Sequence, residues 1–237
     1  MKYLLYISGL MYLLSFIERR LIYSGFIAGA IYLFLRAETA GRLPIAGPHD
    51  TLVLFSAFTG IMSLLFEYSK IKDKIPYNLT GFISAVLVLS SLFFEPAKAP
   101  LSPVLRTFWF ELHVVTAFIS YALFGVGLVA GISYLLRKEP LYEELQYKSI
   151  LTGYSLFSFS MIAGGIWAFY AWGSYWIWTP KELWTVILWL FYTLYLHMRI
   201  KGINSKRVNI FLGMAGFGVV LFTYLGVSLL MKSSHSF

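Results

Sequence analysis

Residues 164–182 read G-G-I-W-A-F-Y-A-W-G-S-Y-W-I-W-T-P-K-E, and the rest of the chain is organised around this tryptophan stretch. Six of the seven tryptophans in the chain fall between positions 167 and 189. The stretch closes with T-P-K-E, in which the proline is expected to break the helix. The last two residues of the stretch, Lys181 and Glu182, are charged. Large aromatic faces gathered in one segment suit a flat, apolar ligand. Four of the tryptophans lie within the stretch itself: Trp167, Trp172, Trp176 and Trp178.

The segments on either side of the tryptophan stretch are predominantly apolar. Of the 237 residues, 59% are hydrophobic and only 13% are charged, whereas about 25% of a soluble domain is charged. Runs of around 20 apolar residues have the length that spans a bilayer. The sequence therefore predicts an all-α integral membrane protein, a bundle of about eight transmembrane helices with a Trp-rich extracytoplasmic loop. The apolar segments are 3–17, 21–35, 51–66, 78–94, 112–136, 153–173, 183–198 and 208–230.

We interpret residues 1–237 as one polytopic membrane domain, with four helices in 1–103 and the tryptophan stretch in 104–237. All eight prolines fall in the gaps between the segments, because proline lacks the N–H that a helix interior needs. The first two segments are short for a full span. The gap 137–152 mixes charged and apolar residues and predicts a short amphipathic surface helix.

The distribution of positive charge predicts the orientation of the helices. If the N-terminus is outside, the inner loops carry 12 Lys and Arg and the outer loops carry 7, which together are all 19 in the chain. Because cytoplasmic loops are enriched in Lys and Arg, this bias places the N-terminus outside and, after eight spans, the C-terminus outside as well. The tryptophan stretch is then extracytoplasmic.

Composition also argues against several function classes. The net charge of +8 is explained by the cytoplasmic loops, so the expected partner is the lipid bilayer and not nucleic acid. Without cysteine the chain has no disulfide and no thiolate ligand. All eleven acidic residues fall at or outside the segment ends, whereas ion-coupled transporters usually carry an acid within a span. The sequence has no Gly-rich phosphate loop.

Four histidines are the candidate ligands of the chain. His113 begins the fifth segment and His235 lies two residues from the C-terminus, so both map to the outer face with the tryptophan stretch. His197 lies in the last inner turn of the seventh segment, and His49 precedes the third. Neutral imidazole is a good axial ligand for haem iron. The alternative is that these histidines are interfacial or solvated and that the tryptophans form an aromatic belt; their confinement to one loop favours a ligand surface.

The pattern W-A-x-x-x-W-G-x-x-W-x-W-x-P-K-E resembles the tryptophan-rich WWD signature of the haem-handling proteins of cytochrome c biogenesis. The P-K-E ending and the eight spans are similar to the CcsA (ResC-like) component of system II. The resemblance covers 104–237 closely and the first half loosely, through R-A-E-T-A-G-R-L-P before the third segment. It implies that haem b is the bound group and that the membrane is a cytoplasmic (inner) or thylakoid-type membrane.

The resemblance implies roles for three histidines. His113 resembles the first outer haem ligand, and His235, in H-S-F, resembles the second. His197 resembles the histidine that lies within the membrane after the signature. The four tryptophans of the stretch would form the haem platform. The outer cations Lys181 and Arg106 are expected to contact the propionates.

Two departures from the family pattern stand out. Thr179 occupies the position of the aspartate in the signature, so a hydroxyl remains but the charge is lost. No histidine precedes His49, whereas the family has another membrane histidine in its N-terminal part. An inner haem would then have His197 alone or an unusual partner such as Tyr32.

The predicted function is haem binding at the outer face and delivery of the haem to apocytochrome c for covalent thioether attachment. The implied partners are a ResB/CcsB-type membrane protein and an apocytochrome with a Cys-x-x-Cys-His segment. Whether the pair acts as a holocytochrome c synthase of the haem lyase type stays open. The alternatives are a haem exporter or chaperone without a synthase role, a cytochrome b-like electron-transfer subunit, and a structural subunit with an ordinary aromatic belt.

Overall fold

The structure is a computed structural model that describes residues 1–97, 102–203 and 205–230. The chain divides into two compact units, Met1–Arg106 and Thr107–Phe237, and each is described by itself. Both are built from helices, and the described ranges contain no β-strand. The predicted fold class is confirmed.

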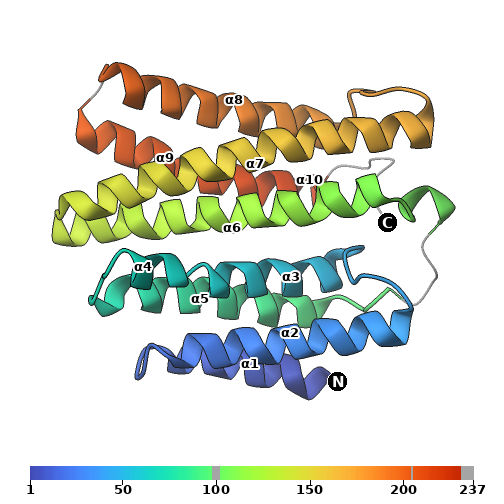
Figure 1. Cartoon of the computed structure of the whole chain (residues 1–237), viewed down its shortest axis with the longest axis horizontal. Coiled ribbons are helices and arrows are strands. Elements are labelled where there is room, and N and C mark those ends of the chain that lie inside the picture. Colours follow the sequence, from blue (N-terminus) through green and yellow to red (C-terminus); the bar gives the residue numbers. More distant parts are fainter. Residues whose placement is uncertain (98–101, 204, 231–237) are drawn as a thin grey trace. The chain divides into compact units, whose positions relative to one another are not determined.

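The first unit consists of helices that run back and forth (Figure 1). The third helix is interrupted between α3 and α4, and the last ends in a 3₁₀ turn, η1. A further 3₁₀ turn, η2, stands near the end of the unit. The elements are α1 (Lys2–Leu14), α2 (Leu21–Ala40), α3 (Pro48–Ile61), α4 (Leu64–Tyr68), α5 (Lys74–Ser90), η1 (Ser91–Phe93) and η2 (Pro103–Leu105).

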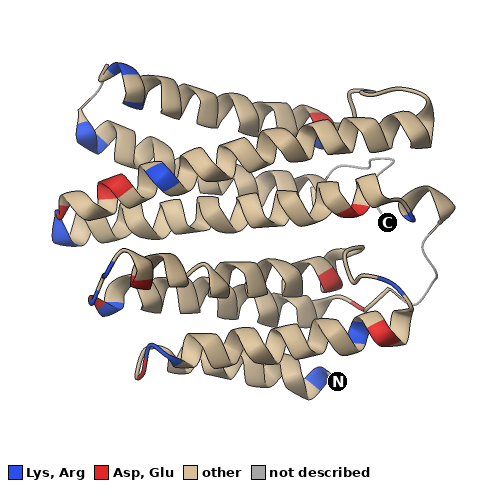
Figure 2. Cartoon of the chain, in the orientation of Figure 1, with Lys and Arg blue, Asp and Glu red and all other residues tan. Residues whose placement is uncertain are grey.

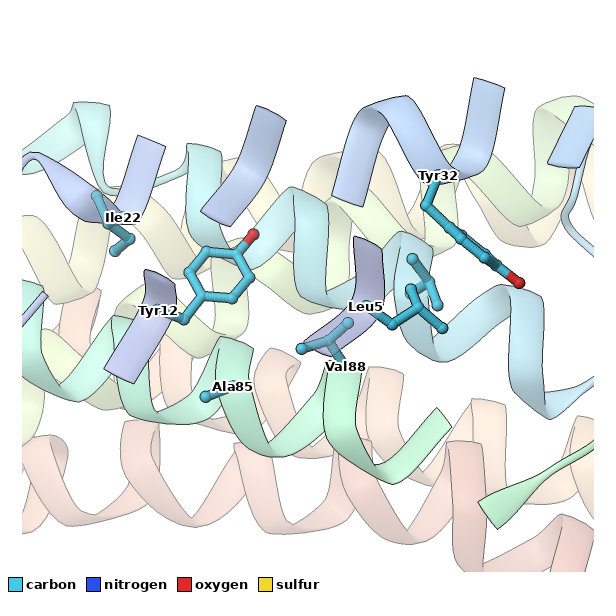
Figure 3. Close-up of a cluster of buried hydrophobic side chains, with 7 residues drawn as sticks. Leu5, Tyr12, Ile22, Tyr32, Ala85 and Val88 are labelled. Atoms are coloured by element: carbon cyan, nitrogen blue, oxygen red, sulfur yellow. The ribbon is translucent and has the colours of Figure 1, made fainter. Parts of the chain in front are cut away.

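Tyr12 of α1 lies near the centre of the core of this first unit (Figure 3). Its ring packs against two glycines: a Cβ at Gly25 would lie 2.7 Å from the ring, and a Cβ at Gly60 would lie 2.5 Å from the hydroxyl oxygen. The absence of these side chains lets α2 and α3 approach α1 closely, as small residues do between membrane helices. The core cluster is Leu5, Tyr12, Ile22, Tyr32, Val53, Ala85 and Val88.

The second unit contains the longest helices of the chain. In Figure 1, α6 and α7 lie side by side, and their contact is the most extensive between any two helices. The last helix is interrupted by a π-helical turn, η3. The elements are α6 (Phe108–Arg137), α7 (Pro140–Trp172), α8 (Pro180–Lys201), α9 (Lys206–Leu221), η3 (Phe222–Gly226) and α10 (Val227–Leu230).

Capping residues set where the helices of the second unit begin and end. The hydroxyl of Thr107 accepts a hydrogen bond from the backbone N–H of Phe110 (3.2 Å), which caps α6. Pro180 occupies the first turn of α8, where its missing N–H costs nothing and its fixed φ suits a helix. The proline in T-P-K-E therefore begins a helix. The helix before it, α7, ends at Trp172 and is capped by Gly173, whose φ of 73° is in the left-handed region that glycine tolerates.

Seven helices are long and apolar enough to cross a membrane, among the described residues. The second predicted segment extends to Ala40 as α2 and reaches the length of a full span with 20 residues, although the sequence suggested a short one. The remaining apolar helix, α1, has 13 residues. At 1.5 Å per residue it is about 20 Å long, less than the roughly 30 Å of a hydrocarbon core.

The predicted surface helix over 137–152 is wrong, because α6 ends at Arg137 and residues 140–152 are the beginning of α7. Pro140 starts that helix, and Tyr142, Gln146 and Ile150 are buried within the second unit. The charges that suggested a surface location have partners: Glu143 accepts from Arg199 at 2.8 Å. A helix that extends beyond the apolar run keeps its polar residues at its end, where they pair with those of neighbouring helices.

The charged residues gather towards the ends of the helices (Figure 2). Every one of the eleven acidic residues lies in a loop or within five residues of a helix end. The prediction that no acid occupies the middle of a span is confirmed.

Candidate functional site

The tryptophan stretch joins two helices of the second unit. Residues 164–172 form the last turns of α7, residues 173–179 form the connecting loop, and Pro180 begins α8. In Figure 1 this loop lies at the same end of the unit as the beginning of α6. The rings of Phe110 and Trp167 are 5.3 Å apart, which brings the first turn of α6 against the tryptophan stretch.

His113 faces α7 from the second turn of α6. Its Nδ1 lies 2.8 Å from the backbone carbonyl oxygen of Ser160. Because a carbonyl can only accept, Nδ1 carries the proton, and a neutral imidazole then has its lone pair on Nε2. The hydroxyl of Ser160 donates to the backbone carbonyl of His113 (2.9 Å), and its oxygen lies 3.1 Å from Nδ1.

Gly164, the first residue of the tryptophan stretch, contacts the imidazole of His113. A Cβ at this position would lie 2.7 Å from Nδ1 and 2.9 Å from Cε1. Any other residue would displace the ring or the helix. The structure therefore brings together one predicted ligand and the tryptophan stretch, although they are separated by 51 positions in the sequence.

The loop between α7 and α8 is held by Glu182. Its Oε2 accepts hydrogen bonds from the backbone N–H groups of Thr179 (2.8 Å) and Ile177 (3.1 Å). The hydroxyl of Thr179 accepts in return from the N–H of Glu182 (3.3 Å), which completes a capping box at the start of α8. Trp178 lies between the two bonded N–H groups and has a φ of 57°, a conformation that is uncommon for a bulky residue.

The four tryptophans of the stretch differ in exposure. Trp167 is only 4% exposed, because its ring packs between those of Phe110 and Trp172. It therefore lies beneath the exposed rings of the stretch. Trp172 and Trp178 are 44% and 67% exposed. Trp176 is half-buried and packs edge-on against Trp178, with ring centres 6.3 Å apart.

The two tryptophans that follow the stretch contribute to helix packing. The indole N–H of Trp189 donates to the hydroxyl of Ser158 (2.9 Å), and its ring stacks on Tyr154. Trp184 contacts Phe222 of η3, with ring centres 4.3 Å apart. These contacts place both rings between helices of the second unit.

The other predicted site residues lie outside α6, on other parts of the chain, or outside the described residues. His197 is exposed near the C-terminal end of α8, 17 residues after Pro180 and so about 26 Å along the helix axis from the loop. Lys181 is in the first turn of α8. Arg106 is exposed and is the last residue of the first unit. His235 lies outside the described residues.

His49 belongs to the core of the first unit. It is 1% exposed, its Nε2 accepts from the hydroxyl of Tyr32 (2.6 Å), and its Nδ1 donates to the carbonyls of Ser91 (2.8 Å) and Phe94 (3.0 Å). Both ring nitrogens are thus satisfied within the unit. Tyr32 lies in the second half of α2, His49 lies in the first turn of α3, and this hydrogen bond engages the hydroxyl of Tyr32.

The family model for the cytochrome c assembly protein matches residues 47–235, most of the chain and all of the site described above. The chain belongs to the cytochrome c assembly protein family. This confirms the resemblance that the tryptophan signature indicates.

Curated proteins of cytochrome c biogenesis match most of the chain. The CcsA cytochrome c biogenesis protein of Chlamydomonas reinhardtii is 30% identical over 227 residues, which cover 87% of this chain and 64% of that protein. CcsA of Prochlorococcus marinus (strain MIT 9312) is 31% identical over 248 residues, which cover 87% of this chain and 80% of that protein. The chain thus spans less than two thirds of the algal relative.

A solved structure shares the fold of this assembly protein. The cytochrome c heme lyase CcmF superposes with a TM-score of 0.65 over 94% of this chain and 44% of that chain, at 16% sequence identity. At this identity the likeness concerns the arrangement of the helices alone.

Proposed function

We propose that this chain binds haem at the tryptophan-rich end of its second unit and delivers it to an apocytochrome c for covalent attachment. The observation that carries the proposal is the contact between His113 and the tryptophan stretch. An imidazole and a set of exposed indole rings are the two components that a haem needs, an axial ligand and an apolar surface.

The donor set fits haem chemically. With its proton on Nδ1, which donates to the carbonyl of Ser160, His113 has the lone pair on Nε2, the atom that bonds to iron. Trp172 and Trp178 offer exposed faces for the macrocycle. His235 is our candidate for the second haem ligand, and Lys181 and Arg106 are our candidates for binding the propionates.

The residues of the chain position the haem and do not take part in bond formation. The haem supplies two vinyl groups, to which cysteine thiols add. Each addition forms one C–S bond and one C–H bond and consumes one S–H bond and one C=C π bond, so it needs reduced thiols and no oxidant. The chain contains no cysteine, so its own side chains cannot compete for the vinyl groups. The indole rings would exclude water and leave the vinyl edge accessible.

Two partner proteins belong to the proposed function, and one of them supplies the thiols. We expect an apocytochrome with a Cys-x-x-Cys-His segment to approach from the extracytoplasmic side, and a ResB/CcsB-type membrane protein to complete the assembly. His197, near the opposite end of α8, would hold haem before it reaches the outer site. Release at the outer site would follow when the histidine of the apocytochrome replaces one of the two ligands.

Two rival functions make different predictions. A haem exporter or chaperone would use the same site but would leave the haem non-covalently bound to its acceptor. A cytochrome b-like subunit needs pairs of histidines on facing helices within the membrane. Among the described residues, the histidines are His49, His113 and His197, and His49 is engaged by Tyr32 and two carbonyls. The site favours haem delivery.

Covalent haem staining tests the proposal. The chain is co-expressed with a ResB/CcsB-type partner and an apocytochrome c, and haem that resists denaturing electrophoresis is quantified. We expect His113→Ala and His235→Ala to abolish the stained band, while Ile203→Ala, at an exposed loop residue, retains it. An apocytochrome without its two cysteines is the negative control. Normal holocytochrome yield in both histidine variants, with normal membrane insertion, would contradict the proposal.

A further inference from the structure

The imidazole of His113 is seated on two residues that lie one turn apart on α7, Ser160 and Gly164. The Ser160 carbonyl oxygen is 2.8 Å from Nδ1, and the Ser160 hydroxyl both contacts Nδ1 at 3.1 Å and donates to the backbone carbonyl of His113 at 2.9 Å. Ser160 is fully buried, so these interactions form inside the unit. We call Ser160 and Gly164 the His113 seat.

Gly164 makes the Ser160 carbonyl accessible. In a helix the Cα–Cβ bond tilts towards the N-terminus, so the side chain of a residue covers the turn that precedes it. A side chain at position 164 would cover the carbonyl four residues earlier, and its Cβ would lie 2.7 Å from Nδ1 of His113. Glycine at this position leaves one lone pair of the Ser160 carbonyl open to the imidazole.

We propose that Ser160 and Gly164 are positioning residues that hold His113 in the Nδ1–H tautomer and direct Nε2 towards the iron. This inference rests on the proposed function. A free imidazole in water favours the other tautomer, in which Nε2 carries the proton and cannot bind a metal. A hydrogen bond from Nδ1–H to a carbonyl fixes the productive tautomer, fixes the ring orientation and makes Nε2 a stronger donor.

The tautomer can be measured without any haem. The full-length protein is labelled with ¹⁵N-histidine and examined in membranes by solid-state NMR, and the signals of His113 are assigned by their loss in His113→Gln. We expect a protonated Nδ1 and an unprotonated Nε2 at neutral pH. A proton on Nε2 of His113 overturns the inference.

A pair of adjacent glycines provides a matched test of the seat. Gly164→Ala introduces a Cβ that clashes with the imidazole, whereas a Cβ at Gly165 meets only the carbonyl oxygen of Tyr175 at an ordinary 3.5 Å. We expect Gly164→Ala to weaken haem retention about ten- to hundredfold, the usual effect of disturbing an outer-shell partner, and Gly165→Ala to retain wild-type haem content. Equal haem retention in the two variants overturns the inference.

Ser160→Ala provides a readout that a merely structural role would not change. The variant keeps the backbone carbonyl but loses the hydroxyl that touches Nδ1. The imidazole becomes a weaker donor to iron, so we expect the haem to stay bound and its reduction potential to rise. This variant also serves if Gly164→Ala does not fold. An unchanged potential in Ser160→Ala, with the haem still bound, overturns the inference.

His113→Ala separates a failure of the seat from a failure of the proposed function. If His113→Ala binds haem with a wild-type spectrum, the proposed function is wrong and the seat loses its purpose. If His113→Ala loses the spectrum while Gly164→Ala and Ser160→Ala both match the wild type in haem retention and potential, the site stands and the seat is refuted.

Discussion

At the scale of single residues, the side chain of Glu182 holds the loop between α7 and α8 in place. A single oxygen of its carboxylate accepts from the N–H groups on both sides of the Trp178 residue, whose backbone has the left-handed φ of 57°. That conformation costs of order 1–2 kcal/mol for an L-residue. Two charge-assisted hydrogen bonds, each worth about 1.5–3 kcal/mol, offset that cost.

We therefore predict that Glu182→Ala loosens the loop while Glu182→Gln largely preserves it. Both N–H groups bond to the same oxygen, and the amide oxygen of glutamine can still accept from them. Hydrogen exchange of the amides at 177 and 179 provides the measurement. We expect exchange at least tenfold faster in Glu182→Ala than in Glu182→Gln. Equally slow exchange in both variants would show that the carboxylate does not hold the loop.

Thr179 is the N-cap of α8, which explains how the family aspartate can be replaced here. Aspartate and threonine both cap helices through a side-chain oxygen, and replacing such a cap by alanine costs about 1 kcal/mol. We predict that Thr179→Asp retains thermal stability and holocytochrome yield, whereas Thr179→Ala lowers the free energy of unfolding by about 1 kcal/mol. A large gain of yield in Thr179→Asp would mean that the aspartate has a role in haem handling beyond capping.

At the scale of the elements, the packing of α8 against α9 depends on a missing side chain. A Cβ at Gly216 would lie 2.5 Å from the ring of Tyr192, whereas a Cβ at Gly218 would meet nothing within 4 Å. We predict that Gly216→Ala destabilises the protein by about 1–3 kcal/mol through overpacking, and that Gly218→Ala does not. Thermal unfolding in detergent compares the two variants, and equal midpoints would refute this prediction.

Local signals in the sequence predicted the elements well, but not their full length or their packing. The apolar runs and the prolines gave the helix order. They missed the first turns of α7, because the partner of Glu143 is Arg199, which only the folded unit brings near. The T-x-x-E pattern of Thr179 and Glu182 is a recognisable capping box and could have been predicted. The seat of His113 could not, since nothing local indicates which helix faces the imidazole.

The tryptophans illustrate the same limit. Their clustering predicted a surface, yet Trp167 is buried and Trp178 is exposed. The two residues differ in their neighbours and not in their local sequence chemistry: Trp167 is on a helix that packs against Phe110, and Trp178 is in a loop. The composition of a segment can predict an aromatic surface, but only the fold determines which of its rings are exposed on that surface.

At the scale of the whole molecule, the orientation in the membrane remains a prediction from charge. The chain lacks cysteine, so single-cysteine labelling has no background. We expect a membrane-impermeant maleimide to label Leu43→Cys, in the loop between α2 and α3, in intact cells. It should label Ile203→Cys, in the loop between α8 and α9, only after lysis. Both residues are exposed. The reverse labelling pattern would invert the predicted topology and place the tryptophan stretch inside.

The visible absorption spectrum of the detergent-purified protein tests haem binding by His113 most directly. It is recorded in the oxidised and reduced states beside His113→Ala, with Gly218→Ala as the control, from cells with ample haem. The account predicts a Soret band with sharp reduced α and β bands in the wild type and control, and their loss or shift in His113→Ala. A protein without a chromophore, or an unchanged spectrum in His113→Ala, would contradict it.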